Sequence, residues 1–272
     1  MQNALAEISK VGGQESITER DAQNVNQLVR KMGIGFLEEP ELDVASSLSN
    51  QLLGLPEEKF EQIAAELKIQ YLLEKEIRVL STGEMRKVQI ARILINSPEI
   101  LILDEPFDGL DQSSRIDLAQ IIDDLMDDSR TVILVTHRQR EILPNISHVL
   151  ALGDGKIMFK GKREDILKPP RMKLLYPSSF KTFFTIPAQE DGHKRHVTGK
   201  FSEILVSMKN VTIKYGNTTV LDTVSWTMRS GENWIILGPN GCGKTTLLNL
   251  ITGDNPQAYA NEIYLFGQRC GS

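Results

Sequence analysis

A glycine-rich loop between two apolar segments is the feature that most limits what this chain can fold into. The loop follows the apolar run Trp234–Leu237 and precedes the apolar segment 247–251. It consists of Gly238, Pro239, Asn240, Gly241, Cys242, Gly243, Lys244, Thr245 and Thr246. Glycines let a backbone turn tightly and bring several N–H groups close to a phosphate chain. The order strand, loop and helix therefore predicts a nucleotide phosphate site; the alternative is a glycine-rich connection that binds nothing.

Two side chains at the end of this loop suit the same ligand. Lys244 supplies a positive charge for the β- and γ-phosphates, and Thr245 supplies a hydroxyl for Mg²⁺. The positive end of the following helix dipole faces the same anion. Cys242 lies at that helix N-terminus, where a thiol tends to have a lowered pKa. We therefore expect alkylation of Cys242 to block nucleotide binding, unless the residue is inert and faces away.

Length and composition exclude several classes of protein. The chain has 272 residues, of which 40% are hydrophobic, so it can bury a substantial core. No apolar run approaches the roughly 20 residues that span a bilayer, and the N-terminus has no signal-peptide pattern. With two cysteines, one of them inside the loop, the chain fits a reducing compartment better than a disulfide scaffold. We expect a cytoplasmic protein, with peripheral binding to the inner face of a membrane left open.

Charge is distributed unevenly along the chain. The net charge is −5, yet residues 160–200 carry ten Lys or Arg against four Asp or Glu. The segment 166–202 also contains several prolines and no sustained period, so we interpret it as a linker. Its basic and aromatic residues indicate either a solvated linker or a surface for nucleic acid. The residues concerned are Tyr176, Phe180, Phe183, Phe184, Lys194 and Arg195.

The remaining pattern predicts an α/β fold. Helices are expected at 19–32, 56–67, 84–96 and 113–126, and buried strands at 100–103 and 131–135. Strands that alternate with helices indicate a parallel sheet. A hairpin is expected at 148–159, and after the linker extended segments at 203–208, 211–214 and 220–228 lead into the loop.

Several polar groups follow these strands or begin these helices, and each has a plain structural alternative. Ser81, Thr82, Gly83 and Glu84 form a capping-box pattern before a helix. Asp104 and Glu105 end a buried strand, where one carboxylate suits Mg²⁺ and the other an attacking water. Asp111 either begins the next helix or has a role at the site. His137 is either structural or a γ-phosphate contact at the same sheet edge.

Together these motifs resemble the ATP-binding-cassette (ABC) ATPase family. Segment 80–84 is similar to its signature, 100–106 to Walker B, Asp111 to the D-loop and 135–137 to the H-loop. The loop 238–246 is similar to Walker A, and Tyr215 to the A-loop aromatic that stacks on adenine. The resemblance implies a P-loop NTPase core with a parallel sheet, a small antiparallel part and a helical subdomain around 41–96. Thr82 and Glu84 depart from the usual Gly and Gln, which predicts a weaker signature.

The order of the motifs is unusual, because the signature, Walker B and H-loop precede Walker A. The chain resembles the central part of a twin-cassette protein, most like the molybdate-transport ATP-binding or photorepair subfamily. Residues 1–165 would be the C-terminal portion of a first cassette, 166–202 the linker, and 203–272 the N-terminal portion of a second. The cassettes are thus either incomplete or permuted.

The resemblance implies catalytic roles for Glu105, His137 and Asp111, with ATP and Mg²⁺ as cofactors. In the twin arrangement, Lys244 and Ser81 hold one ATP between them, while Glu105 and His137 serve the opposite site. In the permuted alternative, the second half folds onto the first, and Lys244 shares a site with Asp104, Glu105 and His137.

The resemblance also implies a second cassette as partner, from missing parts of the same protein or from a homodimer. Two uses of ATP-driven closure remain open. One is an energising subunit for a separate membrane permease, with molybdate as the implied substrate. The other is a soluble ATPase that acts on nucleic acid or ribosomes.

Overall fold

The computed structural model describes residues 34–36, 57–126, 130–175 and 203–270. The expected helix 19–32 lies outside these residues. The first part of the chain forms the following elements: β1 Ile34–Phe36, α4 Glu57–Glu66, α5 Thr82–Leu94, β2 Ile100–Asp104, α6 Gln112–Asp124, β3 Thr131–Thr136, β4 His148–Gly153, β5 Lys156–Lys162, α7 Arg163–Ile166 and α8 Pro169–Leu175. The second part forms β6 Ile204–Tyr215, β7 Thr218–Arg229, β8 Trp234–Leu237, α9 Lys244–Thr252, β9 Glu262–Leu265 and β10 Gln268–Arg269. Short 3₁₀ turns occur at Gln70–Leu72, Ile77–Val79, Gln139–Glu141 and Pro256–Ala258.

A six-stranded sheet forms the centre of the molecule, in the order β1-β2-β3-β8-β4-β5. All neighbouring pairs are parallel except β4 and β5, which form the expected antiparallel hairpin. The predicted α/β fold is therefore confirmed. The short strand β1 was not predicted, since three residues are too few to show a period.

Strand β8 comes from the second part of the chain but lies between β3 and β4 of the first. Its four residues are all buried, with Ile235 and Leu237 in one apolar cluster and Trp234 and Ile236 in the other. Alternate side chains of a strand point to opposite faces, so β8 contributes to both cores of the sheet. This is the arrangement expected if the second half folds onto the first.

The start of β8 is tied to both neighbouring strands by Asn233, which is 1% exposed. Its side-chain Oδ1 accepts a hydrogen bond from the backbone N–H of Val132 at 2.8 Å. Its backbone oxygen accepts hydrogen bonds from the N–H groups of Ser147 and His148 at 2.9 and 3.0 Å. The His148 ring also stacks on Trp234, with centroids 4.8 Å apart. Asn233 thus adds hydrogen bonds to both neighbouring strands to the ladders that hold β8 between them.

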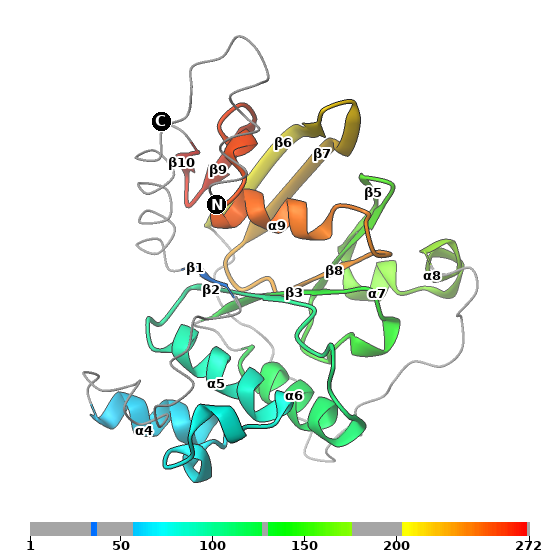
Figure 1. Cartoon of the computed structure of the whole chain (residues 1–272). Helices are drawn as coiled ribbons and strands as arrows, with labels where there is room; N and C mark the ends of the chain where they lie inside the picture. Colours follow the sequence, from blue (N-terminus) through cyan, green and yellow to red (C-terminus); the bar gives the residue numbers. More distant parts are fainter. Residues whose placement is uncertain (1–33, 37–56, 127–129, 176–202, 271–272) are drawn as a thin grey trace.

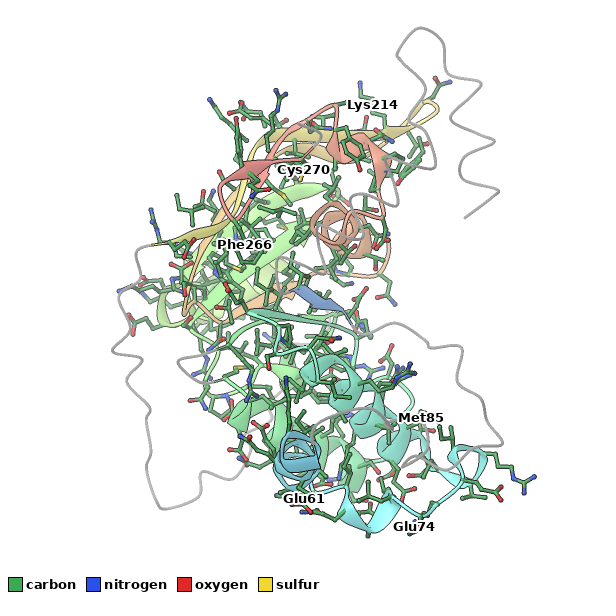
Figure 2. All side chains as sticks on the ribbon, turned by 90° about the vertical axis from the view of Figure 1, so that its left-hand side faces the viewer. Glu61, Glu74, Met85, Lys214, Phe266 and Cys270 are labelled. Carbon is green, nitrogen blue, oxygen red and sulfur yellow. The ribbon has the colours of Figure 1, made fainter. Side chains whose placement is uncertain are left out.

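Two further layers cover the sheet (Figures 1 and 2). Helices α5 and α6 pack on one face, and α9 with the antiparallel sheet β10-β9-β6-β7 lies on the other. Figure 2 shows Met85 of α5 and Lys214 of β6 toward opposite ends of the molecule. The small antiparallel part that the resemblance implies is present. Of the implied helical subdomain around 41–96, helices α4 and α5 are present, and residues 41–56 lie outside the described residues.

The expected linker differs from the structure at its start. Ile166 ends α7, and Pro169–Leu175 form helix α8. Pro169 and Pro170 occupy the first helical positions, where a missing N–H costs no intrahelical bond. Met172 is fully buried in the core cluster of the helical layer and anchors α8. The rest of the expected linker, 176–202, lies outside the described residues.

Candidate nucleotide-binding site

The glycine loop connects β8 to α9 at the carboxyl edge of the central sheet. A Cβ at Gly238 would meet the backbone oxygen of Leu152 at 2.5 Å, so only glycine fits beside β4. Gly241 and Gly243 have φ of +80° and +101°, a region that favours glycine. Pro239, Asn240 and Gly241 are exposed, and a Cβ at Gly241 would meet open space. The loop therefore has the shape and the accessibility that a phosphate chain requires.

Lys244 is 6% exposed and points back into the loop. Its Nζ donates hydrogen bonds to the backbone oxygens of Gly238 at 3.0 Å and Pro239 at 3.2 Å. The same Nζ lies 3.4 Å from Oε1 of Glu105. The positive charge of Lys244, which the sequence assigns to phosphates, is thus balanced here by two loop carbonyl oxygens and by the Glu105 carboxylate.

Thr245, the next residue of α9, contacts the last residue of β2. Its Oγ1 donates a hydrogen bond to Oδ2 of Asp104 at 2.9 Å. The other oxygen, Oδ1, is buried and has no hydrogen-bond partner among the described residues. Burial raises the pKa of Asp104, and the hydroxyl of Thr245 opposes that effect. A hydroxyl and a carboxylate with a free oxygen are ligands that a hard cation prefers.

Glu105 and His137 follow the adjacent strands β2 and β3 and face each other. Nδ1 of His137 lies 3.0 Å from Oε2 of Glu105, and both side chains are about a quarter exposed or less. Glu105 has φ of +45°, uncommon for a residue with a Cβ, and its N–H donates to the backbone oxygen of Val135 at 3.0 Å. The turn after β2 thereby directs the Glu105 carboxylate toward both His137 and Lys244.

The signature segment forms the capping box that its sequence predicts. Ser81 Oγ accepts from the N–H of Glu84 at 3.2 Å, and Glu84 Oε2 accepts from the N–H of Ser81 at 2.8 Å. Lys75 Nζ donates to the other Glu84 oxygen at 3.1 Å, and these bonds lower the pKa of Glu84 against the opposing effect of burial. The extra negative charge expected at Glu84 is therefore paired within the chain. Ser81 and Thr82 are exposed.

Asp111 begins helix α6, as one of its two interpretations predicts. Its carboxylate accepts hydrogen bonds from Ser113 Oγ and from both the N–H and Oγ of Ser114. These bonds hold the pKa of Asp111 well below its usual range. The start of α6 packs closely on the start of α5: an added Cβ at Gly83 would lie only 2.9 Å from the Cβ of Ser114. The signature and D-loop segments are thus neighbours.

The predicted residues form two groups. Lys244, Thr245, Asp104, Glu105 and His137 meet at one edge of the central sheet. The signature and Asp111 lie at the helix starts in the layer on the other face, and within the described residues no hydrogen bond or ion pair joins them to the loop. Thr246 lies in the first turn of α9 and is half-buried.

Tyr215 ends β6 and is 53% exposed. Its hydroxyl accepts a hydrogen bond from Nδ2 of Asn255 at 3.0 Å. The hairpin that it closes approaches the loop, since a Cβ at Gly243 would lie 3.0 Å from the backbone oxygen of Val220. The ring is thus available for stacking, as the A-loop resemblance implies.

The expected lowering of the Cys242 pKa is wrong, and the alternative of an inert residue fits better. Its side chain is 5% exposed, and burial raises its pKa more than Lys244 and nearby backbone N–H groups lower it. A Cβ at Gly238 would lie 2.6 Å from Cys242 Sγ, so the thiol packs beneath the loop. Desolvation outweighs the helix terminus here, and the thiol is protected.

Sequence reasoning missed three charged residues beside Glu105 and His137. Arg138 Nη2 lies 2.9 Å from Oδ1 of Asp108, and its Nη1 lies 3.2 Å from Oε1 of Glu141. Glu141 is 3% exposed. For Arg138 and Glu141 the signal in the sequence was a cluster of charges directly after the H-loop histidine, which also describes an ordinary solvated turn; Asp108 lies in the turn after β2.

Comparison with known proteins identifies the family. The sequence model described as "ABC transporter" matches residues 3–108 and 221–271, more than half of the chain. The chain belongs to the ABC transporter family. The predicted family, with its P-loop ATP-binding core, is confirmed, and its members are ATP-hydrolysing enzymes.

Curated relatives of this cassette chain are longer than it is. It is 37% identical to the ABC transporter ATP-binding protein ModF of Escherichia coli over 211 residues, which cover 78% of this chain and 43% of ModF. It is 32% identical to an uncharacterized ABC transporter ATP-binding protein of Schizosaccharomyces pombe, with 83% and 46% covered. The chain thus spans less than half the length of these relatives.

Solved structures similar to the cassette chain include the ADP conformation of MJ1267, an ATP-binding cassette of an ABC transporter. The TM-score is 0.47 at 23% identity, with 57% of this chain and 71% of that chain covered. Within the described part of the chain, no helix is both long and apolar enough to cross a bilayer.

Proposed function

We propose that the chain binds MgATP and hydrolyses it at a site that its two halves form together. The observation that carries this proposal is the contact of Thr245 with Asp104 at 2.9 Å, beside the approach of Lys244 to Glu105 at 3.4 Å. These contacts put a phosphate-binding loop next to the carboxylates that phosphoryl transfer to water needs. No second half-cassette is required to complete this set of side chains.

The side chains present fit a magnesium nucleotide. Asp104 has a buried oxygen without a partner, and Thr245 adds a hydroxyl to the same point. We propose these two residues as the protein's contribution to Mg²⁺ binding. When bound, Mg²⁺ neutralises charge on the phosphate oxygens.

Lys244 is the proposed phosphate contact. Its ammonium now binds two loop carbonyls and approaches Glu105, so a bound γ-phosphate would replace these partners with a stronger anion. That exchange releases Glu105 from Lys244. The proposed base is thereby freed as the substrate arrives.

Glu105 is the proposed general base and His137 the group that steadies the transition state. A carboxylate within hydrogen-bond reach of an attacking water orients it and takes its proton. Nδ1 of His137 contacts Glu105; in the imidazolium form, in which both ring nitrogens carry hydrogen, Nε2 would donate to the phosphate. The two side chains then contact the reacting water and the γ-phosphate from one side.

The signature segment is proposed to act on a second cassette. Ser81 and Thr82 are exposed at the start of α5, in the layer away from the loop, which suits contact with a nucleotide held by another copy or by missing parts of the protein. Gly83, Glu84 and Asp111 support that surface through the capping box and the packing of α5 on α6. Tyr215 is proposed to stack on adenine.

Closure of two cassettes on ATP is the proposed output, with a separate membrane permease as the partner and molybdate as the substrate class implied by resemblance. Membrane association would then be peripheral. A nucleic-acid role rests on Lys194 and Arg195, which lie outside the described residues. Salt-sensitive RNA or DNA binding that is lost on substitution of these two residues would favour that role instead.

MgATP turnover of the purified chain tests the proposal, with nucleotide binding measured beside it. Lys244→Ala should lose both binding and turnover, and Glu105→Gln should lose turnover while it keeps binding. Each loss of turnover should be at least about 100-fold, because removal of one transition-state contact costs that much. Wild-type binding without turnover would instead indicate that the chemistry needs parts of a longer protein.

A further inference from the structure

Arg138 connects three segments around the proposed catalytic pair. It directly follows His137, and its N–H donates to Thr136 Oγ1 at 3.0 Å. Its guanidinium forms ion pairs with Asp108, in the turn after β2, and with Glu141, in the turn after β3. The residue therefore holds the turn that carries Glu105 against the turn that carries His137.

The buried carboxylate of Glu141 holds the guanidinium of Arg138 in place. Glu141 is 3% exposed, accepts a hydrogen bond from the buried Thr136 hydroxyl, and has Arg115 Nε at 3.9 Å from Oε1. Arg115 in turn donates to the backbone oxygen of Leu110 at 2.9 Å. Two arginines thus balance the two carboxylates Glu141 and Asp108. A buried carboxylate held on several sides gives Arg138 one defined orientation.

Asp108 is close enough to compete for the imidazole of His137. One ligand atom from each of Glu105, Asp108 and His137 lies within 4.8 Å of the others. An unpaired carboxylate at this distance attracts an imidazole N–H as Glu105 does. Arg138 balances the charge of Asp108 in an ion pair at 2.9 Å whose angles are not those of a hydrogen bond, whereas Glu105 contacts His137 at 3.0 Å.

We infer that Arg138 is a positioning residue, which keeps His137 on Glu105 by holding Asp108 away from it. The inference rests on the proposed function, since it assigns Arg138 to the same site. The ion pairs of the Arg138 guanidinium are with Asp108 and Glu141, and neither is a proposed reacting group. Its effect on turnover passes through Asp108, and this distinguishes it from a residue needed only for folding.

Turnover and nucleotide affinity of three variants test the inference. Arg138→Gln should lower kcat by about 10- to 100-fold, the scale expected for a misplaced catalytic group, and leave nucleotide affinity within about threefold of wild type. Arg138→Gln combined with Asp108→Asn should recover most of that kcat, because the competing carboxylate is gone. Arg140→Gln is the matched control: this exposed arginine, two positions on, has no hydrogen bond or ion pair within the described residues and should keep the wild-type rate. If Arg138→Gln does not fold, Arg138→Lys, which keeps a cation beside Glu141, takes its place with the same Asp108→Asn partner.

A spectroscopic readout separates this inference from the proposed function. The chain has four histidines, so a ¹⁵N-histidine spectrum is simple, and the His137 resonances are assigned by their loss in His137→Gln. A carboxylate-bound imidazole N–H exchanges slowly with water and gives a downfield proton signal. We expect that signal in wild type, in Arg140→Gln and in the double variant, and its loss or displacement in Arg138→Gln.

The outcomes have different meanings. A wild-type chain without turnover, but with the expected pattern of signals, contradicts the proposed function and supports the positioning role. Wild-type kcat and an unchanged signal in Arg138→Gln overturn the inference alone. A loss of kcat that Asp108→Asn does not recover also overturns it, because Arg138 would then act through the fold. Absence of the signal in wild type overturns the Glu105–His137 bond on which the inference depends.

Discussion

Thr245 donates a hydrogen bond to Asp104 across 141 positions of the chain, at 2.9 Å. The two residues belong to segments that a twin-cassette interpretation assigns to different cassettes. Their contact follows from the place of β8 between β3 and β4, since the ends of β2 and β8 then meet at one edge.

Removal of the Thr245 hydroxyl should weaken Mg²⁺ binding at the nucleotide site. Thr245→Val keeps the shape of the side chain and should raise the Mg²⁺ concentration for half-maximal nucleotide binding by about 10- to 100-fold, the range seen when a metal site loses one supporting group. Thr245→Ser keeps the hydroxyl and should stay close to wild type. Mg²⁺ titrations with a fluorescent ATP analogue measure both. Equal effects of the two substitutions would mean that the hydroxyl is not used.

Asn233 offers a test of the place of β8 that needs no nucleotide. Asn233→Ala leaves the buried N–H of Val132 without its acceptor and should lower the free energy of unfolding by about 1–3 kcal/mol. Asn249→Ala is the control, because that half-buried side chain on α9 has no hydrogen bond among the described residues; about 0.5 kcal/mol or less is expected. Urea denaturation gives both values. An Asn233→Ala chain as stable as wild type would be incompatible with β8 between β3 and β4.

Asp123 should make stability depend on pH. This residue is 8% exposed, and burial raises its pKa from 3.8 to about 6, against the opposing hydrogen bond from the N–H of Asn145. The folded state therefore holds the proton more tightly than the unfolded chain. The resulting stabilisation is complete below about pH 4 and is lost as pH rises through about 6, in total about 3 kcal/mol.

Asp123→Asn removes this titration and keeps an acceptor for Asn145. The difference in unfolding free energy between wild type and Asp123→Asn should therefore move by about 2.5 kcal/mol, to the disadvantage of wild type, between pH 4 and pH 7. The exposed Glu61 on α4, which is not among the groups that shift the pKa of Asp123, provides the control, since Glu61→Gln should give a nearly constant difference. A flat profile for Asp123→Asn would contradict the raised pKa.

Both cysteines should react slowly in the folded chain. Burial raises the pKa of Cys270 from 9.0 to about 11, which leaves about 100-fold less thiolate at pH 8, and it also raises the pKa of Cys242. Ellman's reagent should therefore react at least about 100-fold faster in urea than in buffer for the Cys242→Ser chain, which reports Cys270 alone. Cys270→Ser reports Cys242. Rapid labelling of Cys242 in buffer would contradict its raised pKa and support the reactive thiol expected at a helix N-terminus.

The elements and the individual motif residues were accessible from the sequence because their signals are local. The apolar run before Gly238, the capping pattern of Ser81 and Glu84, and the acids after 100–103 each depend on a few neighbouring positions. Helix α8 was missed because Pro169 and Pro170 indicate a break, although prolines are tolerated in a first helical turn.

The pairing of the two halves could not be chosen from the sequence. Strand β8 is apolar on both faces, and such a strand fits between any two parallel strands of a similar kind. The hydrogen bonds that select its place come from Asn233, a polar residue that looks like part of a turn. Arg138 and Glu141 were missed for the same reason, since charge in a turn normally indicates exposure.

The place of β8 also has a consequence for the time course of folding. Strands β3 and β4 are not adjacent to each other, and β8 lies between them. The ribosome synthesises β8 about a hundred residues after β3, so one edge of each strand stays unpaired until then. Until then two apolar strands have unpaired edges, which is the condition that favours association with other chains. Contacts of such long sequence separation are formed slowly. We therefore expect the nascent chain to depend on chaperones until Leu237 has emerged, and to become independent of them once that strand is in place.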